Sequence, residues 1–171
     1  SAFLKTDGTL HAMGSNYHGQ LGTGSVDPVE SPLQVASGVV TASSGYHTLY
    51  AKTDGSLWAM GANGKGQLGD GTTTDRLSAV RVVDANVTKV AVGTSFSVFL
   101  KADGSVWSMG VKGKIGDGGR VDRSLPVRVI ESGAVSLSVA DGHSLVRKTD
   151  GSLWGFGNGL SNGKLGLGKM S

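Results

Sequence analysis

The sequence of 171 residues contains no cysteine, only 3 prolines and only 6% aromatic residues. Without cysteine, a disulfide framework and a thiolate metal site are both excluded. Three prolines are too few for a collagen-like or proline-rich chain. No apolar run approaches the roughly 18 residues of a membrane-spanning helix, so we expect no membrane partner. These absences favour an ordinary folded domain that is held together by its core.

Charge of either sign is also modest. The chain carries 16 basic and 13 acidic residues, which gives a formal net charge of +3. No block of lysine or arginine stands out, although such blocks are typical of nucleic-acid-binding tails. Composition alone therefore gives little support to a polyanion partner.

Glycine, in contrast, is abundant, with 29 residues at regularly spaced positions. A Lys-x-Asp-Gly phrase occurs four times, with its Asp-Gly pairs at 7–8, 54–55, 103–104 and 150–151. The steps between successive copies are 47, 49 and 47 residues. A period of this size indicates a fold of stacked or radially arranged repeats.

Each repeat has the pattern of four short strands. Apolar stretches flank every Asp-Gly pair, which predicts a hairpin with a type I′ turn and positive φ at both residues. Third strands are predicted at 31–35, 78–82 and 125–129, and fourth strands at 39–43, 87–91 and 134–138. No segment has the pattern of a capped helix. Four strands per unit predict an all-β fold, a β-propeller formed by residues 1–171 as a single repeat domain.

The repeat also resembles a known family. Residues 51–58 read Ala-Lys-Thr-Asp-Gly-Ser-Leu-Trp, Gly66-Gln67-Leu68-Gly69 follow, and the third repeat has a Pro-x-x-Val element at 126–129. The element Gly45-Tyr46-His47 precedes the second hairpin. These motifs resemble the regulator-of-chromosome-condensation (RCC1-like) repeat. The resemblance implies a propeller, commonly of seven blades around a central channel, and leaves the function open because this fold has unrelated partners.

The number of repeats is not integral. The chain holds about three and a half repeats, whereas a closed ring needs whole blades and an open one exposes strand edges. We expect the chain to be a segment of a longer propeller. The alternative is a homo-oligomer that closes the ring, although joining two copies would omit about 20 residues at each seam.

The repeated polar residues are interpreted as structural. Aspartate fits the turn, and the lysines keep an exposed strand soluble; the alternative for the lysines is a basic arc for phosphates. His11 stands where the other repeats have tryptophan, and His18, His47 and His143 lack the spacing of a zinc site. We expect no catalytic residue, no metal and no cofactor. The lysines of the four Lys-x-Asp-Gly phrases, called the arc lysines, are Lys5, Lys52, Lys101 and Lys148.

The loop after each repeat glycine varies in length and chemistry, while the flanking strands keep their register. Such variation on a rigid scaffold is typical of binding surfaces. We predict that partner-binding residues lie in this loop: Tyr17, His18, Lys65, Lys112, Lys114 and Lys164.

The sequence therefore predicts a non-catalytic, protein-binding propeller scaffold. The uniform, glycine-rich repeats suggest a bacterial or metagenomic source and a segment of a larger RCC1-like protein. Two alternatives stay open: nucleic acid or another polyanion on the basic arc, and carbohydrate binding. A secreted or cell-surface location is favoured over a cytoplasmic one.

Overall fold

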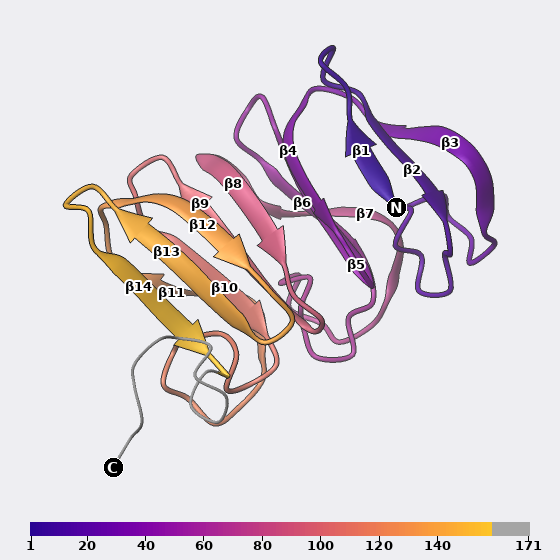
Figure 1. Ribbon diagram of the computed structural model, residues 1–171. Helices are drawn as coiled ribbons and strands as arrows, with labels where there is room; N and C mark the ends of the chain where they lie inside the picture. Colours follow the sequence, from indigo (N-terminus) through magenta and orange to yellow (C-terminus); the bar gives the residue numbers. More distant parts are fainter. Residues whose placement is uncertain (159–171) are drawn as a thin grey trace.

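The computed structural model describes residues 1–158, and over that range it contains fourteen strands and no helix (Figure 1). The strands form four antiparallel sheets, called blades 1 to 4 here. Within residues 1–158, no helix is long and apolar enough to cross a membrane.

Blades 2 and 3 have four strands each, and blades 1 and 4 have three within the described residues. Blade 1 comprises β1 (Ala2–Leu4), β2 (Leu10–Gly14) and β3 (Val29–Ala36). Blade 2 comprises β4 (Val39–Ser44), β5 (His47–Lys52), β6 (Leu57–Gly61) and β7 (Arg76–Val83). Blade 3 comprises β8 (Val87–Val92), β9 (Phe96–Lys101), β10 (Val106–Gly110) and β11 (Arg123–Ile130). Blade 4 comprises β12 (Ala134–Val139), β13 (His143–Lys148) and β14 (Leu153–Gly157).

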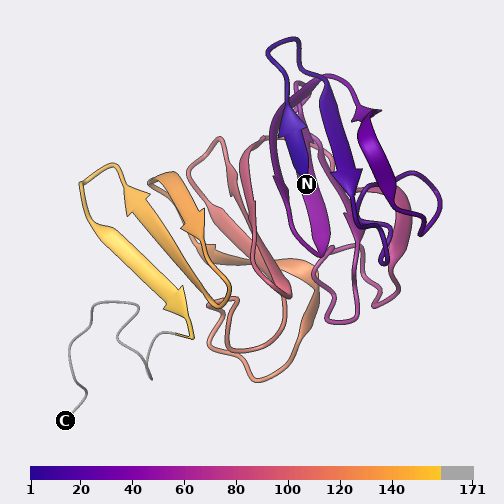
Figure 2. The same cartoon turned by 45° about the vertical axis from the view of Figure 1, so that its right-hand side comes forward.

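The blades stand side by side like the leaves of a fan (Figures 1 and 2). Strand β4 contacts β1 on one side and β8 on the other, and β8 contacts β12. This radial stacking of antiparallel sheets is the arrangement of a β-propeller. The predicted fold class is confirmed.

The core consists of apolar layers between successive blades. Between blades 2 and 3, Leu49 and Leu57 pack against Phe99 and Met109, and all four are fully or almost fully buried. Similar layers lie between blades 1 and 2 and between blades 3 and 4. Because neighbouring residues of a strand point to opposite faces, each inner strand contributes to two layers.

The predicted third and fourth strands are present. The third strands are β3, β7 and β11, each at the edge of its sheet. Pro32 and Pro126 lie in the irregular stretches where these edge strands break register with β2 and β10. A proline cannot donate to a strand ladder, so an edge strand with a bulge accommodates it. The fourth strands begin the next blade as β4, β8 and β12.

The hairpins are at the predicted positions, but the predicted type I′ turn is wrong. In the second hairpin, Gly55 has φ of 77°, whereas Asp54 is not among the residues with positive φ. Gly55 N–H donates to the Lys52 carbonyl (2.9 Å) and Lys52 N–H to the Ser56 carbonyl (3.0 Å). This is a three-residue loop with a left-handed glycine at its end. The extra loop residue, Thr53, explains why aspartate need not adopt positive φ.

The first three hairpins dock onto the blade that follows. The carbonyls of Gly8, Gly55 and Gly104 accept hydrogen bonds of 2.9, 2.9 and 3.0 Å from the first residue of the next inner strand. A Cβ on Gly55 would lie 2.5 Å from the backbone nitrogen of Asn86. Gly55 is therefore needed both for its φ and for this close approach, and Gly104, whose Cβ would lie 2.6 Å from the backbone nitrogen of Gly133, is in the same position.

Candidate functional site

The variable loops and the short turns between inner strands gather at one end of the blades. This end is called the loop face. The opposite end, where the Asp-Gly hairpins lie, is called the hairpin face. The loop face comprises residues 15–28, 62–75 and 111–122 and the turns 45–46, 93–95 and 140–142. Ala62 N–H donates to the Tyr46 carbonyl (3.0 Å) and Val111 N–H to the Ser95 carbonyl (2.9 Å), which ties loop to turn.

A buried asparagine organises each of the first two loops. Asn16 accepts a hydrogen bond from Leu21 N–H (2.9 Å) and donates to the Ser25 carbonyl (2.8 Å). Asn63 accepts from Leu68 N–H (3.0 Å) and donates to Asp70 Oδ1 (3.0 Å). Both side chains are fully buried. These loops are consequently held in one conformation although they lack regular secondary structure.

Tyr17 and His18 lie on the loop of blade 1, next to blade 2. The Tyr17 side chain is exposed, with 78% of its surface accessible. His18 Nδ1 lies 2.9 Å from Asp75 Oδ2, and its ring meets the edge of the Tyr46 ring at a centroid distance of 6.2 Å. Tyr46 is 59% exposed. The accessible Tyr46 therefore contacts a histidine that Asp75 holds in place, and the accessible Tyr17 is the neighbour of this histidine in the sequence.

The predicted lysines reach the same face but do not form one basic patch. Lys65 Nζ lies 3.5 Å from Asp122 Oδ2, which bridges the loops of blades 2 and 3. Lys112 is exposed, and its backbone N–H donates to Asp122 Oδ1 (2.9 Å). Lys114 Nζ donates to the Asp141 carbonyl (3.2 Å). Lys164 lies outside the described residues.

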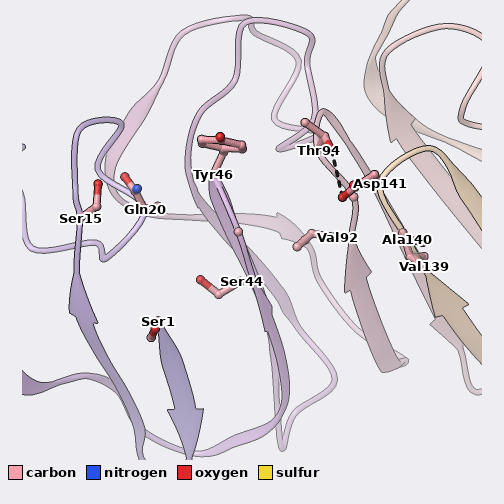
Figure 3. Close-up of a pocket in the computed structure, with 12 residues that line it drawn as sticks. Ser1, Ser15, Gln20, Ser44, Tyr46, Val92, Thr94, Val139, Ala140 and Asp141 are labelled. Atoms are coloured by element: carbon pink, nitrogen blue, oxygen red, sulfur yellow. Dashed lines mark hydrogen bonds between the residues drawn. The ribbon is translucent and has the colours of Figure 1, made fainter.

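A pocket opens at the loop-face ends of β4, β8 and β12. Its cavity volume is about 480 Å³ (Figure 3). Blade 1 contributes Gln20, blade 2 contributes Ser44 and Tyr46, and Thr94 and Asp141 come from blades 3 and 4. Thr94 Oγ1 donates to Asp141 Oδ1 across the last two blades (3.5 Å). Four blades thus meet at one cavity, and Tyr46 is part of its lining.

Sequence reasoning did not select Tyr46, Asp75, Asp122 or Asp141 as site residues. Tyr46 and Asp141 lie in the short turns that follow the fourth strands. Their position at the end of a strand was the sequence signal that could have marked them as site residues. Asp75 and Asp122 precede the edge strands β7 and β11. Their pairing with His18 and Lys65 crosses from one blade to the next, so no local pattern reveals it.

The hairpin face repeats one arrangement of side chains. In blade 2, Asp54 Oδ1 accepts from Ser56 Oγ (2.6 Å), and Ser56 Oγ accepts from Trp58 Nε1 (2.9 Å). The hydrogen bonds from Ser56 hold the pKa of Asp54 below its usual value. Lys52 Nζ lies 4.8 Å from the centroid of the Trp58 ring, a cation–π contact. Blades 3 and 4 have the same set: Asp103, Ser105, Trp107 and Lys101, and Asp150, Ser152, Trp154 and Lys148.

Blade 1 departs from this set at His11. The His11 ring stacks on Phe3 at a centroid distance of 5.4 Å, and its Nε2 lies 3.1 Å from Thr9 Oγ1. Stacked pairs Tyr50–Trp58 and Phe99–Trp107 occupy the equivalent places in blades 2 and 3. His11 therefore takes over the structural contacts of tryptophan. No group of three potential metal-ligating side chains occurs within residues 1–158.

One buried histidine links two blades beneath the loop face. Ser97 Oγ donates its single proton to the Gln67 carbonyl (2.7 Å), so it must accept from His47 Nε2–H (2.7 Å). The Nδ1 atom of His47 is buried and has no partner. Burial lowers the pKa of His47 to about 4, so the ring is neutral near pH 7.

These features define a repeat protein with β-propeller blades and a pocket at one end. The sequence profile of the regulator of chromosome condensation (RCC1) repeat matches residues 7–51 and 54–100, and a second profile of this repeat matches 40–67. The chain belongs to the RCC1 repeat family, as its motifs predicted. The comparison with curated protein sequences gives no match.

Solved structures show the same fold. The structure of human WBSCR16 is 22% identical, with a TM-score of 0.85 over 99% of this chain and 48% of its own. The yeast RCC1 protein Prp20, in a complex with Kap60, is 21% identical, with a TM-score of 0.75 over 91% of this chain and 39% of its own. Prp20p of Saccharomyces cerevisiae, in a study of its binding to Gsp1p and histones, is 23% identical, with a TM-score of 0.75, 91% coverage of this chain and 41% of its own. The chain thus spans less than half the length of these structures.

Proposed function

We propose that this chain is a non-catalytic protein-binding scaffold, within a larger bacterial RCC1-like protein, and that its partner docks on the loop face. The observation that carries the proposal is the pair of exposed tyrosines, Tyr17 and Tyr46, on loops that buried hydrogen bonds hold in place. Tyrosine is enriched at the residues that dominate binding energy in protein interfaces. It offers a large amphipathic contact at low entropic cost.

The charges around the tyrosines support a protein partner over a polyanion. His18 and Lys65 both lie against aspartates, so this face presents both signs of charge. On the hairpin face, the ammonium groups of the arc lysines 52, 101 and 148 lie over tryptophan rings. These contacts restrain the cations that a polyanion would use, and the lysines cover the rings that a sugar would stack on. Prp20 provides a family precedent, since its structure was determined in a complex with the protein Kap60.

The buried serine–histidine pair supports the non-catalytic part of the proposal. Ser97 and His47 have the contact distance of a nucleophile and its base, but both side chains are fully buried. The serine proton points to the Gln67 carbonyl rather than to the histidine. A catalytic pair needs the opposite arrangement, with the base accepting the hydroxyl proton.

The test is affinity capture from a lysate of the source organism, followed by calorimetry with the purified partner. The variant Tyr17→Ala/Tyr46→Ala should bind at least about tenfold more weakly, a loss of about 1.4 kcal/mol. Val40→Ala is the matched control, because Val40 is 49% exposed and lines a pocket with hairpin-face residues. Equal affinity of the tyrosine variant and the wild type would contradict the proposal, as would the absence of any purified protein that binds.

A further inference from the structure

One wall of the loop-face pocket offers a hydrogen-bond acceptor whose proton is already used. Thr48 Oγ1 donates to the Gln20 carbonyl (2.8 Å), since a carbonyl can only accept. A hydroxyl has one proton, so in the 2.7 Å contact between Ser44 and Thr48 the donor must be Ser44. Ser44 Oγ lines the pocket with its proton already used. It therefore offers the cavity only lone pairs.

The opposite wall offers acceptors of the same kind. Thr94 Oγ1 donates to Asp141 Oδ1 (3.5 Å), because an ionised carboxylate cannot donate. Thr94 and Asp141 both line the pocket, and Asp141 forms none of the ion pairs found among residues 1–158. Two hydroxyl oxygens and a carboxylate are thus acceptors without a spare proton. The lining also holds donors, which are the side-chain amide of Gln20 and the hydroxyls of Ser1, Ser15 and Tyr46.

An aromatic ring completes the cavity. Tyr46 lines it and is 59% exposed (Figure 3). A cation held near a tyrosine ring gains about 0.5–2 kcal/mol from the ring quadrupole. Acceptor oxygens, a carboxylate and an aromatic ring together match a ligand that has several N–H donors and a positive charge.

Two cations of the chain lie near this pocket. The Ser1 ammonium donates to the Met13 carbonyl (2.8 Å), and Lys114 Nζ donates to the Asp141 carbonyl (3.2 Å). The second contact shows that an amine already uses an acceptor at this rim. Lys114 and the ammonium of Ser1, a residue of the pocket lining, both oppose a further positive charge by Coulomb repulsion.

We infer that the loop-face pocket binds a basic side chain, an arginine or lysine, that the protein partner inserts between Tyr46 and Asp141. The inference rests on the proposed function and specifies the chemistry of the partner. The cavity of about 480 Å³ is large enough for a guanidinium group and its stem. Arginine is favoured, because its planar fork of donors can contact a carboxylate and stack on a ring at once.

Nuclear magnetic resonance titrations of the isotope-labelled chain test this inference. The probes are acetyl-Gly-Arg-Gly-amide and the same peptide with citrulline, which keeps the shape of arginine and removes its charge. The arginine peptide should shift the amide signals of Tyr46, Thr94 and Asp141 in a saturable way. The citrulline peptide should bind at least about fivefold more weakly, because hydrogen bonds to charged groups are the stronger ones. Equal binding of the two peptides, or no shift with either, would overturn the inference.

Two variants with opposite expected effects on the affinity for the arginine peptide make the titration more specific. Asp141→Asn keeps the shape of the side chain and should weaken arginine binding about fivefold to tenfold. Lys114→Gln removes the competing cation and should strengthen it about twofold to threefold. Asp84→Asn is the control, since the Asp84 side chain is 94% exposed and pairs with Arg81 away from the pocket. Unchanged binding in the Asp141 variant would reject the pocket as the site.

The two proposals fail separately. If the arginine peptide does not bind but Tyr17→Ala/Tyr46→Ala still loses the purified partner, the loop face binds protein by another chemistry. If the peptide binds and no protein partner exists, the pocket recognises a cation in a different molecule, which would overturn the inference as stated.

Discussion

The two ends of the propeller are built from the same repeats, yet they use side chains differently. On the hairpin face, the Asp–Ser–Trp contacts and the stacked lysine recur in blades 2, 3 and 4 with nearly the same distances. On the loop face, equivalent positions hold different residues, such as His18 and Lys65, each with its own aspartate. Repetition thus marks what each blade needs to pack, and departures from it mark where specificity can be placed.

The largest effect should come from the hairpin glycine. Gly55→Ala would force a side chain into positive φ and place its Cβ 2.5 Å from the Asn86 nitrogen. We expect a loss of about 4 kcal/mol in the free energy of unfolding, from backbone strain and overpacking together. Urea denaturation measures it.

Two further glycines separate the causes of that loss. Gly151→Ala has the same φ problem, but within residues 1–158 no atom beyond its chain neighbours lies within 4 Å of the added Cβ, so about 1 kcal/mol should be lost. Gly64→Ala on the loop face has open space and no positive φ, so its effect should stay within about 0.5 kcal/mol. Equal losses in all three variants would refute the distinction between docked and free glycines.

The next effect concerns the buried histidine beneath the loop face. His47 has its pKa lowered from 6.5 to about 4, so the unfolded chain takes up a proton first as pH falls. The contribution of the neutral His47 ring to the free energy of unfolding is fully present above pH 6.5. It falls as the pH is lowered from 6.5 to 4, and about 3 kcal/mol is lost at pH 4. The comparison is with His47→Phe, because Phe96 occupies this place in the next blade. Parallel curves of unfolding free energy against pH for the two proteins would contradict the assignment.

A smaller loss is expected from the hairpin-face contacts. Ser56→Ala removes the hydroxyl that connects Asp54 to Trp58, and about 1 kcal/mol should be lost. Tryptophan fluorescence should change with it, because Trp58 Nε1 loses its acceptor. Ser15→Ala, an exposed loop-face serine, is the control and should leave stability within about 0.5 kcal/mol. A loss of unfolding free energy for Ser15→Ala as large as that for Ser56→Ala would contradict the contrast between the two faces.

The smallest effect belongs to the exposed site residues. Tyr17→Ala should change the free energy of unfolding by less than about 0.5 kcal/mol, since most of the side chain is already in water. His18→Ala should cost no more, because its contact with Asp75 is exposed to solvent. Thermal unfolding checks both, and a loss above about 1 kcal/mol would mean that these residues serve the fold.

The sequence predicted the fold well because its strongest signals are local. Each Asp-Gly pair and its flanking strands lie within about 15 residues, and the same pattern recurs in every blade. The turn type was missed because Thr53 belongs to the loop, a detail that strand pattern does not reveal. The pocket could not be predicted, since Tyr46, Thr94 and Asp141 come from three blades and meet only after the blades pack. The choice of Tyr17, His18 and the lysines as partner-binding residues stays a prediction.

The docking of the first three hairpins onto the blades that follow them gives the propeller a direction. The acceptor is always the glycine of the earlier blade, and the donor is always the first residue of the later one. During synthesis, which begins at the N-terminus, the chain can therefore fold one blade at a time. Each new blade then packs against a blade that has already folded. Stability then approaches a sum of nearest-neighbour terms, as in other repeat arrays. In such an array, the consequences of a defect reach little further than the adjoining blade.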